Sequence, residues 1–217
     1  MTGSSKKVFH SGFLLALIAL LGTALLTGVN ALTHERIVEQ ESLRMMQQLH
    51  AIVPAGSFNN NPLQDRIEIS DETHLRDPDP VTVYRTRMDG KPVAALMIVT
   101  APDGYNGDIR MLVGINNEGL LLGVRIVAHK ETPGLGDPIS LDRSDWILGF
   151  SNRSLQNPDR TAWAVKKDGG VFDQFTGATI SPRAVVKTVR DSLLFFEANK
   201  VTLFDRNSEP VTTSQAK

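Results

Sequence analysis

The first strong pattern in the chain is a long apolar stretch. Residues 11–33, SGFLLALIALLGTALLTGVNALT, are 23 residues without a formal charge. An α-helix of this length, at about 1.5 Å per residue, is about 34 Å long and exceeds the roughly 30 Å hydrocarbon core of a bilayer. The pattern predicts a transmembrane helix over residues 11–33.

A cleaved signal peptide is the alternative, because Val29-Asn30-Ala31 is an acceptable small-residue cleavage site. The apolar stretch is longer than the roughly 7–15 residues of a signal-peptide core, which favours a retained anchor. Lys6 and Lys7 precede the stretch, whereas Arg36 and Arg44 follow it. This small positive-inside bias predicts a cytoplasmic segment at residues 1–10 and an exported body.

Residues 34–80 are expected to form a helical stalk and a loop. Apolar residues recur at roughly helical spacing from residue 34 to about residue 53, and Pro54 and Gly56 end the pattern. The helix could lead away from the bilayer or pack on the following domain. The segment GSFNNNPLQD is rich in turn residues and is expected to be a loop.

Four apolar runs then predict an antiparallel β-meander. The runs are VTVYRTR, KPVAALMIVTA, IRMLVGI and LLLGVRIVAH, and Asp89-Gly90 between the first two is a two-residue hairpin signal. The segment SLDRSDWILGF predicts a short helix capped at Ser140 or Asp142, and TAWAVKK predicts another strand.

A second long helix is predicted from Ser181, as its N-cap, with Pro182 in the first turn, to about Asn199. The expected fold class is therefore α+β, with one transmembrane helix followed by a domain over residues 81–200 that combines an antiparallel sheet with packed helices. Residues 201–217 are polar, and we expect them to be a disordered tail.

Composition narrows the possible functions. The 217 residues carry a net charge of −1, so no basic excess points to nucleic acid. The absence of cysteine excludes disulfides, cysteine-ligated iron–sulfur clusters and cysteine nucleophiles. The five histidines are isolated from one another and show no metal-binding spacing. A redox role would therefore need a cofactor held by other residue types.

Two local clusters are candidates for binding a ligand. In HKETPGLGDPI, residues 129–139, a glycine-rich loop follows a strand, and its amides could approach a ligand closely; the alternative is a solvated surface turn. In DQFTGAT, residues 173–179, Thr179 comes just before a helix N-terminus, which suits a phosphate group. The alternative is that Thr176 and Thr179 are ordinary strand and turn residues.

Together the two clusters resemble a known family of flavoproteins. DQFTGAT matches the flavinylation motif Asp-x-x-(Ser/Thr)-Gly-Ala-(Thr/Ser), and HKETPGLGD resembles a second signature of FMN-binding domains. TAPDGYNGDI, MLVGINNEG, SDWI and WAVKKDGG add to the likeness. Residues 10–200 resemble the G subunits of Rnf (also called Rsx) electron transport complexes. The C subunits of sodium-translocating NADH–quinone reductases share the attachment motif and are the alternative.

The resemblance implies a covalent cofactor and a set of site residues. By this likeness FMN is attached through a phosphoester to Thr179, Asp173 serves recognition by a flavin transferase, and Thr176, Gly177 and Ala178 complete the motif. The same likeness implies that further residues lie close to the flavin. These are Glu131, Thr132 and Leu135 in the loop, and Lys166 and Lys167 before the motif.

The resemblance also implies a function. The chain would be an electron-carrying subunit of a membrane complex that moves electrons between ferredoxin and NAD and couples this to ion translocation, without a catalytic residue of its own. Its partners would be the other complex subunits and the flavin transferase. It would sit in the bacterial inner membrane with its soluble domain in the periplasm. A membrane-anchored assembly module without a cofactor is the non-redox alternative.

Overall fold

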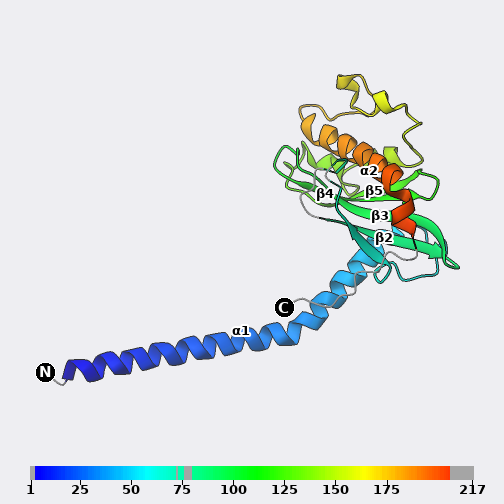
Figure 1. Ribbon diagram of the computed structural model, residues 1–217. Helices are drawn as coiled ribbons and strands as arrows, with labels where there is room; N and C mark the ends of the chain where they lie inside the picture. Colours follow the sequence, from blue (N-terminus) through cyan, green and yellow to red (C-terminus); the bar gives the residue numbers. More distant parts are fainter. Residues whose placement is uncertain (1–2, 72, 76–79, 206–217) are drawn as a thin grey trace. The chain divides into compact units, whose positions relative to one another are not determined.

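The computed structural model describes residues 3–71, 73–75 and 80–205 of the chain (Figure 1). These residues divide into two compact units, 1–46 and 47–217, which are treated separately below. Of the expected tail at 201–217, residues 206–217 lie outside the described residues.

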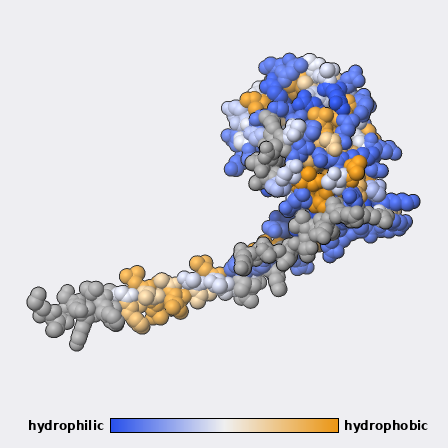
Figure 2. Space-filling view, in the orientation of Figure 1, coloured by the Kyte–Doolittle hydropathy of each residue, from blue (hydrophilic) through white to orange (hydrophobic). Residues whose placement is uncertain are grey.

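The amino-terminal unit consists of the helix α1 (Gly3–His50), whose last residues belong to the second unit. Its segment Gly12–Asn30 has a mean hydropathy of 2.3 and is long and apolar enough to cross a membrane. Figure 2 shows this stretch as an orange, apolar surface. Thr23 and Thr27 each donate their hydroxyl to the carbonyl four residues earlier, at 2.9 and 2.8 Å. These bonds satisfy the two hydroxyls within the helix, as a lipid environment requires.

The second unit is built on a five-stranded antiparallel sheet with its strands in sequence order. The strands are β1 (Arg66–Ile69), β2 (Val81–Met88), β3 (Lys91–Ala101), β4 (Ile109–Asn116) and β5 (Leu121–Ala128). The predicted meander is β2 to β5. Asp89 and Gly90 join β2 to β3 with φ of 50° and 75°, as expected for a hairpin turn with two positive φ values.

The edge strand β1 lies in the stretch expected to be stalk and loop. It pairs with β2 from Arg66↔Tyr84 to Ile69↔Val81. The strand has only four residues, RIEI, which is too short for an alternating pattern to identify it from sequence.

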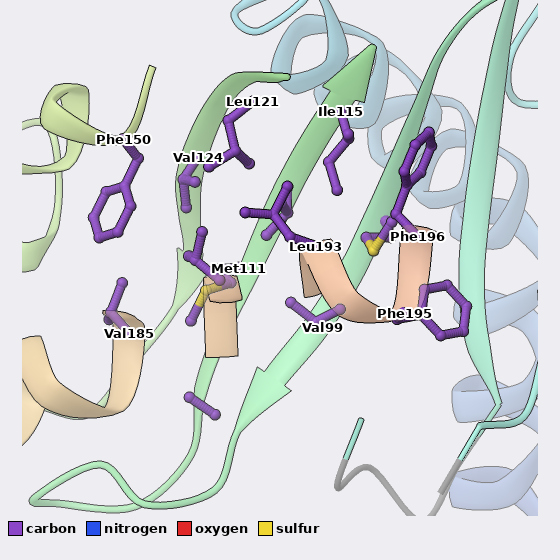
Figure 3. Close-up of a cluster of buried hydrophobic side chains, with 14 of the residues drawn as sticks. Val99, Met111, Ile115, Leu121, Val124, Phe150, Val185, Leu193, Phe195 and Phe196 are labelled. Carbon is purple, nitrogen blue, oxygen red and sulfur yellow. The ribbon is translucent and has the colours of Figure 1, made fainter. Parts of the chain in front are cut away.

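Helix α2 (Ile180–Phe204) covers one face of this sheet and packs on β2, β3 and β4. Figure 3 shows Val185, Leu193 and Phe196 of α2 in one cluster of buried side chains with Val99 and Met111 of the strands. The stripe of apolar residues predicted from the sequence is therefore the buried face of α2.

The helix α2 extends to Phe204, beyond the predicted end near Asn199. Arg87 Nη2 donates to the Phe204 carbonyl at 3.5 Å, and Arg85 Nη1 donates to the Asp205 carbonyl at 3.3 Å. Both arginines also donate to Asp65, at 2.6 Å from Arg85 Nε and 2.8 Å from Arg87 Nε. Cations are favourable at a helix C-terminus, so these strand residues support the extra turn.

The segment between β5 and α2 contains short 3₁₀ helices. They are η1 (Asp137–Ile139), η2 (Asp145–Phe150), η3 (Arg160–Ala162) and η4 (Lys166–Asp168). The predicted helix near residue 145 is η2, and its cap is Ser144, which accepts from Trp146 N at 3.2 Å, rather than Ser140 or Asp142.

The predicted strand TAWAVKK was wrong. This segment forms η3 and η4 with one parallel bridge, Val165↔Phe172, between them. Its alternating pattern has another cause: Trp163 and Val165 are buried in the core, while Ala162 and Ala164 are only partly buried. Burial on alternate positions does not require a hydrogen-bonded ladder.

The second face of the sheet receives the chain as it leaves α1. Leu49, Ile52 and Val53 are buried. Ile52 lies against a notch formed by Gly114 of β4 and Gly123 of β5, which are opposite each other in the register. Arg125 Nη2 donates to the Ala51 carbonyl at 3.0 Å. Both faces of the sheet are therefore covered, which explains why β3 and β4 are apolar almost throughout.

The notch predicts different effects for two similar substitutions. A Cβ at Gly114 would lie 2.4 Å from Ile52 Cγ2, whereas a Cβ at Gly123 would have its nearest contact at 3.6 Å. We expect Gly114→Ala to destabilise the fold by about 1–3 kcal/mol through overpacking. Gly123→Ala is the matched control and should change stability little. Thermal unfolding of both full-length variants in detergent measures the difference; equal melting temperatures would contradict this account of the notch.

Candidate functional site

A cavity of about 330 Å³ lies between the loop after β5 and the start of α2. Three chain segments form it: the β3–β4 turn, the glycine-rich loop and the end of the DQFTGAT motif. The lining residues are Tyr105, Glu131, Thr132, Leu135, Gly136, Gly177, Ala178, Thr179, Ile180 and Ser181. The two clusters that the sequence singled out, about 45 residues apart, thus meet at one site.

The glycine-rich loop is a compact turn. Leu135 N and Gly136 N both donate to the Thr132 carbonyl at 3.1 Å, and Gly134 N donates to Asp137 Oδ1 at 2.6 Å. Gly134 has φ of 76°, which glycine adopts without strain. The turn leaves the Leu135 side chain 47% exposed at the cavity rim.

Gly136 allows this loop to approach α2. A Cβ at Gly136 would lie 2.6 Å from Ser181 Oγ and 2.7 Å from Glu131 Oε2. Only a residue without a side chain fits there. The glycine therefore sets the distance between the loop and the first turn of the helix.

Glu131 joins the three segments that form the cavity. Its side chain is buried, although it carries a carboxylate. One oxygen accepts from Asn106 N at 3.0 Å, and the other accepts a short hydrogen bond from the Ser181 hydroxyl. The Glu131 amide donates to His129 Nδ1 at 3.1 Å. A buried carboxylate needs such partners, so these contacts tie the loop, the turn and the helix together.

The flavinylation-like motif is held from both sides by other segments. Trp146 Nε1 donates to the Asp173 carbonyl at 2.8 Å, and the Trp146 ring meets Phe175 edge-to-face at 5.4 Å. Gly177 has φ of 79°, and Ala178 N donates to the Phe175 carbonyl at 3.1 Å. The motif therefore forms a tight turn that ends on the cavity wall.

Thr179 is placed directly before the first residue of α2. The helix begins at Ile180, so the cap position belongs to Thr179, and the prediction of Ser181 as the cap was wrong. Ser181 instead donates its hydroxyl to Glu131. The Thr179 side chain makes no capping hydrogen bond and is half-buried at the cavity.

The structure brings six of the ten predicted site residues to the cavity. Glu131, Thr132, Leu135, Gly177, Ala178 and Thr179 line it. The other four, which are Thr176, Asp173, Lys166 and Lys167, are not among the lining residues. Lys166 Nζ instead lies 2.5 Å from Asp173 Oδ1, and both side chains are more than half exposed. Lys167 donates its backbone amide to Gln174 Oε1 at 3.3 Å.

Sequence reasoning missed Tyr105, Asn106 and Ile180 as site residues. Tyr105 and Asn106 lie in the turn PDGYNGD, which the sequence analysis included in the family likeness but did not assign to the site. The glycines in the turn were the available signal. A Cβ at Gly104 would lie 2.1 Å from the Gly107 carbonyl oxygen and 3.0 Å from Glu131 Oε1, so the turn packs tightly on the site.

An ion pair joins the turn before the motif to α2. Arg183 Nε lies 2.6 Å from Asp168 Oδ2, and Arg183 Nη2 lies 2.8 Å from Asp168 Oδ1. These hydrogen bonds lower the pKa of the Asp168 carboxyl, and the same bonds raise the pKa of Arg183. The two-point contact fixes the first turn of α2 relative to the approach to the motif.

Comparison with known proteins identifies two families along the chain. Residues 104–194 match the model of an FMN-binding domain, and residues 1–52 match the RnfG N-terminal region. All the residues that line the cavity fall within the first match.

Similar proteins match over nearly the whole length, and each is named as the G subunit of an ion-translocating oxidoreductase complex. The protein of Shewanella loihica is 47% identical over 93% of this chain and 95% of its own. The protein of Pseudoalteromonas atlantica is 43% identical over 93% of this chain and 94% of its own. The protein of Vibrio cholerae is 41% identical, over 90% and 93% of the two chains.

The Asp168–Arg183 pair predicts a measurable titration. The pKa of Asp168 is lower in the folded protein than in the unfolded chain. The stabilisation that the ionised pair contributes is therefore fully present above the ordinary aspartate pKa of about 3.9, and it is lost as the pH falls through the folded pKa. Arg183→Gln should therefore raise the pKa of Asp168, as measured by carboxyl ¹³C NMR titration. Arg160→Gln, which removes a distant pair with Glu197, is the control. An unchanged Asp168 titration in Arg183→Gln would rule out the pair.

Proposed function

Because the chain belongs to the family of G subunits of ion-translocating oxidoreductase complexes, we propose that it carries electrons through an FMN bound covalently at Thr179. The protein is a membrane-anchored flavoprotein of the complex, with an FMN-binding domain over residues 104–194. One observation carries the assignment of the attachment residue: Thr179 lines the cavity at the cap position of α2 without making a side-chain capping hydrogen bond.

The cavity suits the ring system of a flavin. Its volume of about 330 Å³ lies at the lower end of the range for ligand sites, so it would enclose part of an FMN molecule and leave the rest exposed. Three of the lining residues, Gly136, Gly177 and Ala178, have no side chain or only a methyl group, so a ligand can come close to the backbone there. Leu135 and Ile180 supply apolar surface at the rim.

When bound, FMN supplies the redox chemistry, and the protein supplies position and environment. Thr179 would hold the phosphate end. Thr132 and Leu135 would border the ring, with Glu131 fixing the loop that carries them. A phosphoester leaves the ring unmodified and prevents loss of the flavin. Partial exposure suits transfer of electrons to and from neighbouring members of the complex.

Asp173 is proposed to serve the attachment reaction rather than the bound flavin. Its side chain is 69% exposed and lies outside the cavity lining. A flavin transferase could therefore reach it on the folded surface, together with the exposed Thr176. Lys166 would hold Asp173 in place through their ion pair.

The orientation in the membrane is part of the proposal. Lys6 and Lys7 before the apolar segment favour a cytoplasmic amino terminus in the bacterial inner membrane. The FMN-binding domain would then lie in the periplasm, where its partners in the complex and the flavin transferase would meet it.

Covalent attachment predicts a specific mass change. In protein from its native membrane, the peptide that contains Thr179 should be heavier by one FMN less one water. Thr179→Val removes the side-chain oxygen that would form the ester and should abolish the change, while Thr176→Ser, as a matched control, should retain it. A flavinylated Thr179→Val protein would exclude Thr179. Native protein without flavin that still supports the complex would favour the assembly-module alternative.

The orientation predicts the behaviour of reporter fusions. Alkaline phosphatase, which is active only after export, should be active when fused at the carboxyl terminus. A cytoplasmic reporter such as green fluorescent protein, exported by the same route, should be dark at that position. The reverse result would place the flavin domain in the cytoplasm.

A further inference from the structure

The charge of the cavity is unusual for a site that is to hold a phosphorylated cofactor. Glu131 is the one charged residue among the described residues that line the cavity, and none of the lining residues is basic. The two basic residues on the first turns of α2 are engaged with carboxylates. Arg183 pairs with Asp168, and Lys187 lies 3.5 Å from Asp103.

An anion already lies beside the first turn of α2 at the cavity. The Ser181 hydroxyl, in the first turn of α2, donates to the Glu131 carboxylate. Pro182, the next residue, has no amide hydrogen to offer. A helix N-terminus ordinarily attracts a phosphate through its free donors and dipole. Here the buried Glu131 carboxylate lies beside that turn and accepts from the Ser181 hydroxyl, so a phosphate at the same place would meet a negative charge.

The rest of the lining favours an uncharged ligand. Tyr105, Leu135 and Ile180 are 66%, 47% and 42% exposed and present apolar surface around the opening. Gly136, Gly177 and Ala178 leave room for a flat group between them. The phosphate monoester of free FMN carries a charge of about −1.5 to −2 at pH 7, by analogy with phosphorylated side chains. This phosphate would add its negative charge to a cavity whose lining already contains the Glu131 carboxylate.

We propose that the cavity binds the uncharged ring portion of a flavin and rejects the phosphate dianion of free FMN, with Glu131 setting this preference. The inference rests on the proposed function, because it takes the ligand to be a flavin. It implies that the unmodified protein binds riboflavin more tightly than FMN. A bond to Thr179 then retains FMN despite the unfavourable charge, since a diester keeps only one negative charge.

The test compares two flavins on the unmodified full-length protein. The chain is produced without a flavin transferase and purified in detergent, and riboflavin and FMN are titrated by flavin fluorescence against empty micelles. We expect riboflavin to bind about tenfold or more tightly than FMN, because like charges at a binding site oppose association. Raising the ionic strength from about 0.01 M to about 1 M should narrow the ratio, because salt screens the repulsion.

Two variants assign the preference to Glu131. Glu131→Gln keeps the shape but removes the charge: its amide oxygen can accept from Asn106 N, and its amide nitrogen can donate to the Ser181 hydroxyl. The two flavins should then bind with similar affinity. Glu118→Gln removes the same charge at an exposed turn away from the cavity and should leave the ratio unchanged. The salt dependence in the unsubstituted protein tests the charge effect even if Glu131→Gln does not fold.

Three results would overturn the inference. They are FMN binding as tightly as riboflavin at low salt, an unchanged ratio in a folded Glu131→Gln protein, and no binding of either flavin at millimolar concentration. None of them bears on the mass change at Thr179. The charge selection and the covalent attachment can therefore fail separately.

Discussion

The site depends on one buried carboxylate, that of Glu131. It accepts hydrogen bonds from the Asn106 amide, 25 residues earlier, and from the Ser181 hydroxyl, 50 residues later. Burying a charge is costly unless it is paired or hydrogen-bonded, so the cavity exists in this shape only while these partners stay in place. Gly136 is required for the same reason, because a Cβ there would lie 2.7 Å from Glu131 Oε2, whereas Gly104 is required chiefly by the Gly107 carbonyl oxygen, 2.1 Å from its Cβ position.

The motif that ends at Thr179 is made rigid by contacts outside the motif. Trp146 holds the Asp173 carbonyl and packs between Phe150 and Phe175. On the other side, Arg183 clamps the turn at Asp168. The motif therefore meets the cavity as a fixed turn, and its exposed residues remain accessible for an attachment reaction. Within this short motif, Gly177, Ala178 and Thr179 line the cavity, whereas the exposed Asp173 is proposed to serve the attachment reaction.

The sheet connects this site to the rest of the second unit. One face of the sheet packs against α2, whose first turn forms part of the cavity wall. The other face contacts Ile52 in the notch formed by Gly114 and Gly123. The carboxyl end of α2 is supported by Arg85 and Arg87 from β2. The helix that bears the site is therefore held along its length by strands of one sheet.

The sequence by itself determined the features that depend on near neighbours. These were the apolar span, the hairpin at Asp89-Gly90, the meander and the threonine before a helix. The tertiary structure alone decided the edge strand β1, the 3₁₀ turns where TAWAVKK alternates, and the extra turn of α2 at Phe204. It also decided that Ser181 binds Glu131 instead of capping the helix, and that Lys166 pairs with Asp173 outside the cavity. The reason is physical: propensity and periodicity act over a few residues, whereas a buried carboxylate finds its partners only after the sheet has set which distant segments meet.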